Sequence, residues 1–301
     1  MAVTNEQRLL KQSIAMMLFV AFSGLVFGLF TSSQSILFDG IFSLVAAVIK
    51  VMMLITARLI AKESSVRFQF GFWHLEPMVI AFDGALMLLI CIYALANGIF
   101  GLIHGGHHVN FGFASLYAAI ISVSSLFYYN YLKRRNRQIG SDMLRMDCVG
   151  WLADGLLTLG LFCSFALAWL LTGTAWQHWT PFLDPAILVV VALIMLPTTA
   201  RILAPALRDI LRIVPDALDQ KVTDVMDDIV ARRGLGHYQS YVQKEGRARF
   251  IEIHVVLPPD YPLTHIGTLD EIRQEIADAL GKASPQRWLT ISFTGDEKWA
   301  C

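Results

Sequence analysis

The stretch Met146–Thr158, MDCVGWLADGLLT, places two aspartates inside an apolar segment. Asp147 and Asp154 are seven residues apart, so on a helix they share one face, with Gly150 between them. A carboxylate in a membrane-spanning helix costs about 2.5–3.5 kcal/mol on insertion scales, and such residues usually serve a function. The stretch therefore predicts a polar site within a membrane domain.

A second stretch, LFDGIFS, has the same character. It places Asp39 and Ser43 four residues apart on one helix face, which continues to Lys50. For Ser43 alone, a hydrogen bond between helices is the alternative role. Two carboxylates and a hydroxyl from facing helices would make an oxygen-rich cation site. We therefore predict that Asp39, Ser43 and Asp154 meet around a metal ion in transit.

Two further aspartates belong to this prediction, and each has an alternative. Asp83, in a third apolar segment, is either another ligand or the partner of Lys50 in a buried ion pair, and the pairing is slightly favoured. Asp147 is either a ligand or is solvated near the cytoplasmic end of its helix.

The composition of the whole chain indicates a membrane protein. Of its 301 residues, 55% are hydrophobic and 16% charged, which is too apolar for an ordinary soluble protein. The formal net charge of zero gives no basic field for nucleic acid. Six apolar segments approach the roughly 20 residues that a helix needs to cross hydrocarbon. They are expected near residues 13–30, 36–60, 78–103, 111–132, 148–171 and 183–204.

The loop charges predict the orientation of these segments. Lys and Arg gather before the first segment, after the second, between the fourth and fifth, and after the sixth. The other three loops, TSSQS, HGGHHVN and TGTAWQHWTPF, contain none. By the positive-inside rule both termini are cytoplasmic. A bacterial-type inner or plasma membrane is expected.

The composition changes after Arg208. An amphipathic helix pattern, two alternating strands around a Glu-Gly turn, a second helix ending at Gly281 and a last strand follow in turn. The order α-β-β-α-β fits a ferredoxin-like domain. We predict an all-α six-helix transmembrane bundle over residues 1–207 and a cytoplasmic α+β ferredoxin-like domain over residues 208–301.

Two groups of histidines offer further metal-ligand chemistry, because neutral imidazole suits zinc, copper or nickel. His104, His107 and His108 share one outer loop, where a solvated polar loop is the alternative. His237 and His254 lie in the C-terminal domain and predict a regulatory metal site. Polar surface on an open sheet face is the alternative for these two.

Four motifs resemble those of the cation diffusion facilitator family of metal transporters. They are FDGIFSLVAA, FGFWHLEP (Phe70–Pro77), MDCVGWLADG and the pair Asp184-Pro185. The resemblance implies a transporter and not an enzyme, exchanging a divalent cation for protons by alternating access in a homodimer. It also implies that the cytoplasmic domains dimerise and bind regulatory metal. Carried over by position, the transport site is Asp39, Ser43, Gly150 and Asp154.

The sequence departs from the family pattern at three positions. Ser43 stands where a carboxylate, Asn or His is usual, and Gly150 where a His or Asp is usual. Asp83, Asp147 or water would have to fill the place at Gly150. Zinc is the family default, but the oxygen-rich site favours manganese or iron(II). His74 replaces a basic residue that pairs with the linker, where only Asp209 is near. The weakened site motivates an alternative function, a metal-responsive membrane scaffold that no longer transports.

Overall fold

A computed structural model describes most of the chain, in two compact units that are treated separately below. The first unit comprises Met1–Phe72 and Met78–Pro205, and the second comprises Trp73–Pro77 and Ala206–Cys301. The described residues are 2–31, 34–62, 66–105, 113–171, 173–263 and 265–300.

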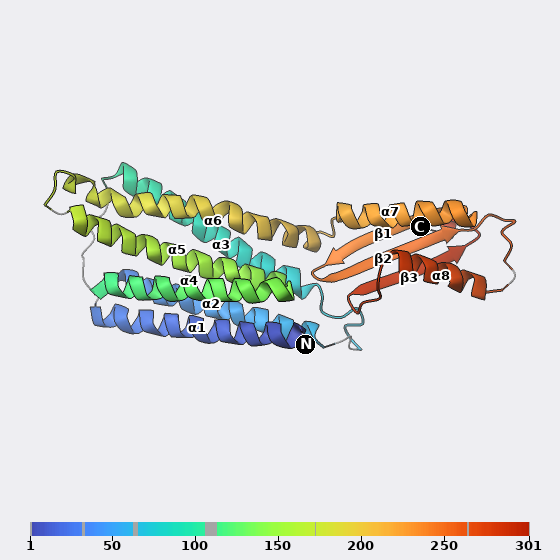
Figure 1. Ribbon diagram of the computed structural model, residues 1–301, viewed down its shortest axis with the longest axis horizontal. Helices are drawn as coiled ribbons and strands as arrows, with labels where there is room; N and C mark the ends of the chain where they lie inside the picture. Colours follow the sequence, from blue (N-terminus) through green and yellow to red (C-terminus); the bar gives the residue numbers. More distant parts are fainter. Residues whose placement is uncertain are drawn as a thin grey trace. The chain divides into compact units, whose positions relative to one another are not determined.

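Long helices build the first unit, and Figure 1 shows them running alongside one another. Each grows from one of the apolar segments, because a helix satisfies all of its own backbone hydrogen bonds where water is absent. They are α1 (Ala2–Thr31), α2 (Gln34–Ile60), α3 (Leu75–Ile103), α4 (Phe113–Ile139), α5 (Asp142–Leu171) and α6 (Thr180–Ile210). A single turn of 3₁₀-helix, Gln177–Trp179, precedes α6.

Within the described residues, five helices are long and apolar enough to cross a membrane: α1, α2, α3, α5 and α6. Helix α4 forms where the fourth segment was predicted but does not belong to this set. Its mean hydropathy is lowered by four serines and two asparagines, and its last turns are basic. The membrane span predicted near residues 111–132, the fourth in the chain, therefore stays a prediction.

Glycines bring neighbouring helices of this unit into close contact. A Cβ on Gly40 of α2 would lie 2.6 Å from the amide nitrogen of Leu25 of α1, and a Cβ on Gly24 would lie 2.8 Å from Cα of Gly40. On α5, a Cβ on Gly155 would lie 2.7 Å from the side chain of Leu126 of α4. Small residues allow such close approach in membrane helices. These contacts bring the backbones near Asp39 and Asp154 close to neighbouring helices.

The second unit is a three-stranded sheet with two helices. The elements are α7 (Asp216–Arg233), β1 (His237–Glu245), β2 (Ala248–Val256), α8 (Gly267–Ala279) and β3 (Arg287–Thr294). Strand β2 is central, antiparallel to β1 and parallel to β3. The predicted order α-β-β-α-β is therefore confirmed, while the ferredoxin-like fold stays a prediction.

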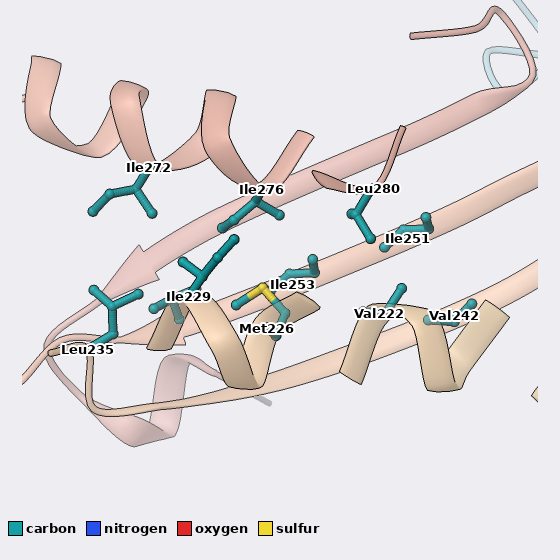
Figure 2. Close-up of a cluster of buried hydrophobic side chains, with 11 residues drawn as sticks. Val222, Met226, Ile229, Leu235, Val242, Ile251, Ile253, Ile272, Ile276 and Leu280 are labelled. Atoms are coloured by element: carbon teal, nitrogen blue, oxygen red, sulfur yellow. The ribbon is translucent and has the colours of Figure 1, made fainter. Parts of the chain in front are cut away.

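The core of the second unit lies between the sheet and both helices. Figure 2 shows the side chains of the helices and strands pointing toward one another. Ile251, Ile253 and Val255 all face this core, as their alternation predicted. At the surface, Arg232 and Arg233 of α7 both pair with Glu275 of α8. The hydrogen bond from Arg233, more than any other contact, holds the pKa of Glu275 below its usual range.

The turn between β1 and β2 contacts the first residues of α3, which belong to the second unit. Glu76 is 2% exposed and receives three hydrogen bonds from Arg247, from its backbone N, Nε and Nη2, at 3.2, 2.8 and 2.7 Å. Gly246 in this turn has φ +60°, and a Cβ there would lie 2.8 Å from Oε2 of Glu76. Glycine is therefore required both for the backbone and for the space.

We expect Gly246→Ala to destabilise the protein more than Gly234→Ala does. Gly234 ends α7 at nearly the same dihedral, φ +64°, but nothing lies within 4 Å of its missing Cβ. Both substitutions carry the left-handed strain of about 1–2 kcal/mol, and only Gly246→Ala also displaces Glu76. The midpoints of thermal unfolding of the two variants measure the difference. Equal shifts would contradict the close contact with Glu76.

Candidate metal transport site

A buried ion pair joins α2 to α5. The Nζ of Lys50 donates a hydrogen bond to Oδ1 of Asp147, and these residues are 5% and 1% exposed. The ammonium also lies 5.0 Å from the ring centroid of Trp151, whose Nε1 donates to Ser13 Oγ at 2.8 Å. This ring contact adds a cation–π attraction to the pair. A lysine in a membrane-spanning helix is thus neutralised within the protein.

The pair corrects two predictions. Lys50 bonds to Asp147, so the slightly favoured partner, Asp83, was wrong. Asp147 is buried and paired, so its predicted alternative of solvation at the helix end was also wrong. The choice between the two aspartates depends on the relative depths of α2, α3 and α5, which cannot be predicted from the pattern of apolar residues.

Asp154 lies seven residues, or about two turns, beyond Asp147 on α5 and reaches toward α4. Its Oδ2 accepts a hydrogen bond from Oγ of Ser125 at 2.6 Å. Gly155, next in the chain, allows α4 to approach closely enough for this bond. The positive charge of Lys50 also acts on the Asp154 carboxyl. Ser125 was not among the predicted site residues, although a serine at the centre of an apolar segment is the signal that would have found it.

The other predicted ligands are only partly placed. Ser43 is buried on α2, and Asp83 on α3 lies where the charges of Lys50 and Asp147 act on its carboxyl. Asp39 lies in α2, but its side chain is outside the described part of the structure. Among the described residues, no three His, Cys, Asp or Glu side chains gather closely enough to hold a metal ion. The described side chains therefore form a polar zone and not a closed ligand set.

The outer histidine site is described at one position only. His104 is exposed, with its ring stacked on Phe100 at 3.8 Å and its Nδ1 2.9 Å from the Phe100 carbonyl oxygen. His107 and His108 lie outside the described residues. The outer-loop metal site stays a prediction.

The two histidines of the second unit lie on the sheet face opposite the core. His237 pairs in register with Val256, and His254 with Gln239, so they are diagonal neighbours. His254 Nδ1 lies 2.6 Å from Ser292 Oγ, while His237 Nε2 lies 3.4 Å from Glu297 Oε1. Each ring thus has its own polar partner, and the predicted regulatory site has no third ligand among the described residues.

Asp209, the acidic residue near the linker position, pairs with a lysine of the second unit. Asp209 accepts a hydrogen bond from Nζ of Lys244 on β1 at 2.9 Å. The basic partner thus comes from the β1–β2 hairpin of the second unit, next to the Arg247 that holds Glu76. His74 itself is exposed.

Comparison with known proteins decides the family. The model of the cation efflux transmembrane domain matches residues 10–211, which is two thirds of the chain. The chain belongs to this cation efflux family. The resemblance stated from the motifs is therefore confirmed, and with the five apolar helices it makes the chain an integral membrane protein.

Two relatives carry the same description, "probable cation efflux system protein". Both come from Mycobacterium tuberculosis, strains CDC 1551 and H37Rv, and each is 25% identical to this chain over 226 residues. The match covers 75% of this chain and 64% of each relative. The chain thus aligns with less than two thirds of the length of these cation efflux proteins.

Proposed function

We propose that this protein exports a divalent metal cation across a bacterial inner or plasma membrane. The metal is exchanged for protons by alternating access in a homodimer. Both termini of each chain are cytoplasmic. Helix α4 crosses the membrane in addition to the five apolar helices, which makes six spans. The observation that carries the proposal is Asp154, a hydrogen-bonded carboxylate within α5 of a cation efflux transmembrane domain. Ionisable residues inside a membrane mark ion pathways.

In this proposal Asp39 and Asp154 are the obligate ligands. Ser43, buried on α2, contributes a hydroxyl oxygen. Asp83 is an auxiliary ligand, because its carboxyl is near the charges of Lys50 and Asp147. Ser125 orients the Asp154 carboxylate in the way that outer-shell groups orient ligands. The resulting ligands are all oxygens, which favour hard cations such as manganese or iron(II) over zinc.

Metal uptake by proteoliposomes tests the proposal. The purified protein is reconstituted, and uptake of zinc, manganese, iron(II), cobalt and cadmium is measured with and without a pH gradient. Uptake of at least one metal is expected, driven by the gradient and lost in Asp39→Asn. The matched control is Asp142→Asn, an exposed aspartate in the first turn of α5. Gradient-driven uptake that survives Asp39→Asn would reject the assigned site.

The alternative is a metal-responsive membrane scaffold that does not transport. It is favoured by the absence of a closed ligand set among the described residues and by the glycine at position 150. Folded, dimeric protein that moves none of the five metals would support the scaffold over the transporter. Metal-dependent changes in the second unit, followed by tryptophan fluorescence, would then be expected.

A further inference from the structure

The ion pair of Lys50 and Asp147 lies beside the position where the family places a ligand. A Cβ built on Gly150 would lie 4.0 Å from Nζ of Lys50, and apart from its own helix backbone no other described residue comes within that distance. A larger side chain at this position would extend into the space next to the ammonium. The ammonium is held there by Asp147 on one side and the Trp151 ring on the other.

Burying this ion pair costs free energy, so a functional reason for it is expected. Taking two charges out of water has a desolvation penalty that their mutual attraction often fails to recover. The pair is also incompletely satisfied, because Oδ2 of Asp147 is buried without a hydrogen-bond partner in the described structure. Apolar residues in the same place would stabilise a helix bundle at least as well. The pair is therefore not explained by stability alone.

The ammonium of Lys50 lies on the helix face that carries an assigned ligand. Asp154 follows Gly150 by four residues on α5, so the two share one face, and the position of a Cβ on Gly150 is 4.0 Å from Nζ of Lys50. A fixed positive charge near a metal weakens the binding of any cation. Its neighbour Asp147 is committed to the ammonium through Oδ1, so Asp147 is unsuited to replace the missing ligand.

We infer that Lys50 is a specificity-determining residue, whose ammonium takes the place of the side chain that the family has at position 150. Asp147 is then the counter-ion of Lys50 and not a metal ligand. This inference rests on the proposed function. It explains why Gly150 and Lys50 occur together: an imidazole at position 150 and an ammonium at Lys50 compete for the same space. The pair thus removes a zinc-favouring ligand and leaves an oxygen-only site.

The test places a histidine at position 150 in two backgrounds. Gly150→His is made in the native protein and in the Lys50→Met/Asp147→Asn protein, which lacks both charges. A background of Lys50→Gln/Asp147→Asn serves as well if the first does not fold. Gly150→Ala in the native protein is the matched control, because its Cβ alone fits beside the ammonium. Zinc and manganese uptake and the thermal unfolding midpoint are measured for all variants.

In the native background, Gly150→His should abolish uptake and lower the unfolding midpoint, while Gly150→Ala should lower the midpoint by less, because its Cβ alone fits beside the ammonium. In the charge-free background, Gly150→His should be tolerated and should raise the ratio of zinc to manganese uptake by about 10-fold or more, as changes around metal ligands do. Equal effects of Gly150→His in the two backgrounds would overturn the inference about Lys50. The proposed function would still stand in that case if uptake by the native protein depends on Asp154.

If the native protein moves no metal, the proposed function fails and the unfolding midpoint still decides the inference. Gly150→His should then lower the midpoint only where Lys50 is present. The same lowering in both backgrounds would show that Lys50 and residue 150 do not share the space.

Discussion

Replacing Asp147 with asparagine should destabilise the protein by about 3–5 kcal/mol, the usual cost of removing one partner of a buried ion pair. The substitution leaves the ammonium of Lys50 in the bundle without its counter-ion, 5% exposed and unable to reach water. The free energy of unfolding in detergent micelles, from denaturant titration, measures the loss.

Two comparisons make this result specific. Asp142→Asn removes a carboxylate from the exposed first turn of the same helix and should be close to neutral. Lys50→Met combined with Asp147→Asn removes both charges and should cost less than Asp147→Asn alone, because no buried charge is then unpaired. A double variant less stable than the single one would show that the attraction between the two groups exceeds their desolvation cost.

Replacing Asp154 with asparagine should reduce metal uptake to the background of empty vesicles. The amide keeps the size of the carboxylate but loses the negative charge that a divalent cation requires. Ser125→Ala should reduce uptake by about 10–100-fold, the usual effect of losing a group that orients a ligand. Initial rates of uptake under a fixed pH gradient measure both variants.

The control for Ser125→Ala is its neighbour. Ser124 is half-buried, and within the described part of the chain its hydroxyl bonds to carbonyl oxygens of its own helix, at Ile120 and Ile121. Ser124→Ala should therefore leave uptake near the native rate. If Ser124→Ala and Ser125→Ala slow uptake equally, the bond from Ser125 to Asp154 has no role in transport.

Local pattern predicted much of the fold. The apolar segments became α1 to α6, and the alternation of Ile251, Ile253 and Val255 placed β2 against its core. Both signals depend only on neighbours in the chain, which fix which side of an element is apolar. Helix ends were less predictable: α6 runs on to Ile210, past the predicted end at residue 204. Its basic residues remain helical, because a long helix needs no apolar environment for its last turns.

The candidate site was less predictable than the fold. Asp39, Asp83, Asp147 and Asp154 were all chosen by one criterion, a carboxylate in an apolar segment. That criterion cannot separate a ligand from a counter-ion, since both are expensive to bury. The distinction comes from contacts between helices, namely Lys50 with Asp147 and Ser125 with Asp154. Such contacts depend on the depth and rotation of each helix, which one sequence does not define.

The near contact between Gly24 and Gly40 limits how the bundle can change shape. A screw motion of α2 by one residue, about 1.5 Å along its axis and about 100° around it, would bring Asp39 or Ile41 to the place of Gly40. The Cβ of either residue would then collide with the Leu25 amide, which is already 2.6 Å from the position of a Cβ on Gly40. This contact therefore opposes relative motion of α1 and α2. We expect a motion that opens the site to take place between this pair of helices and the other helices of the unit.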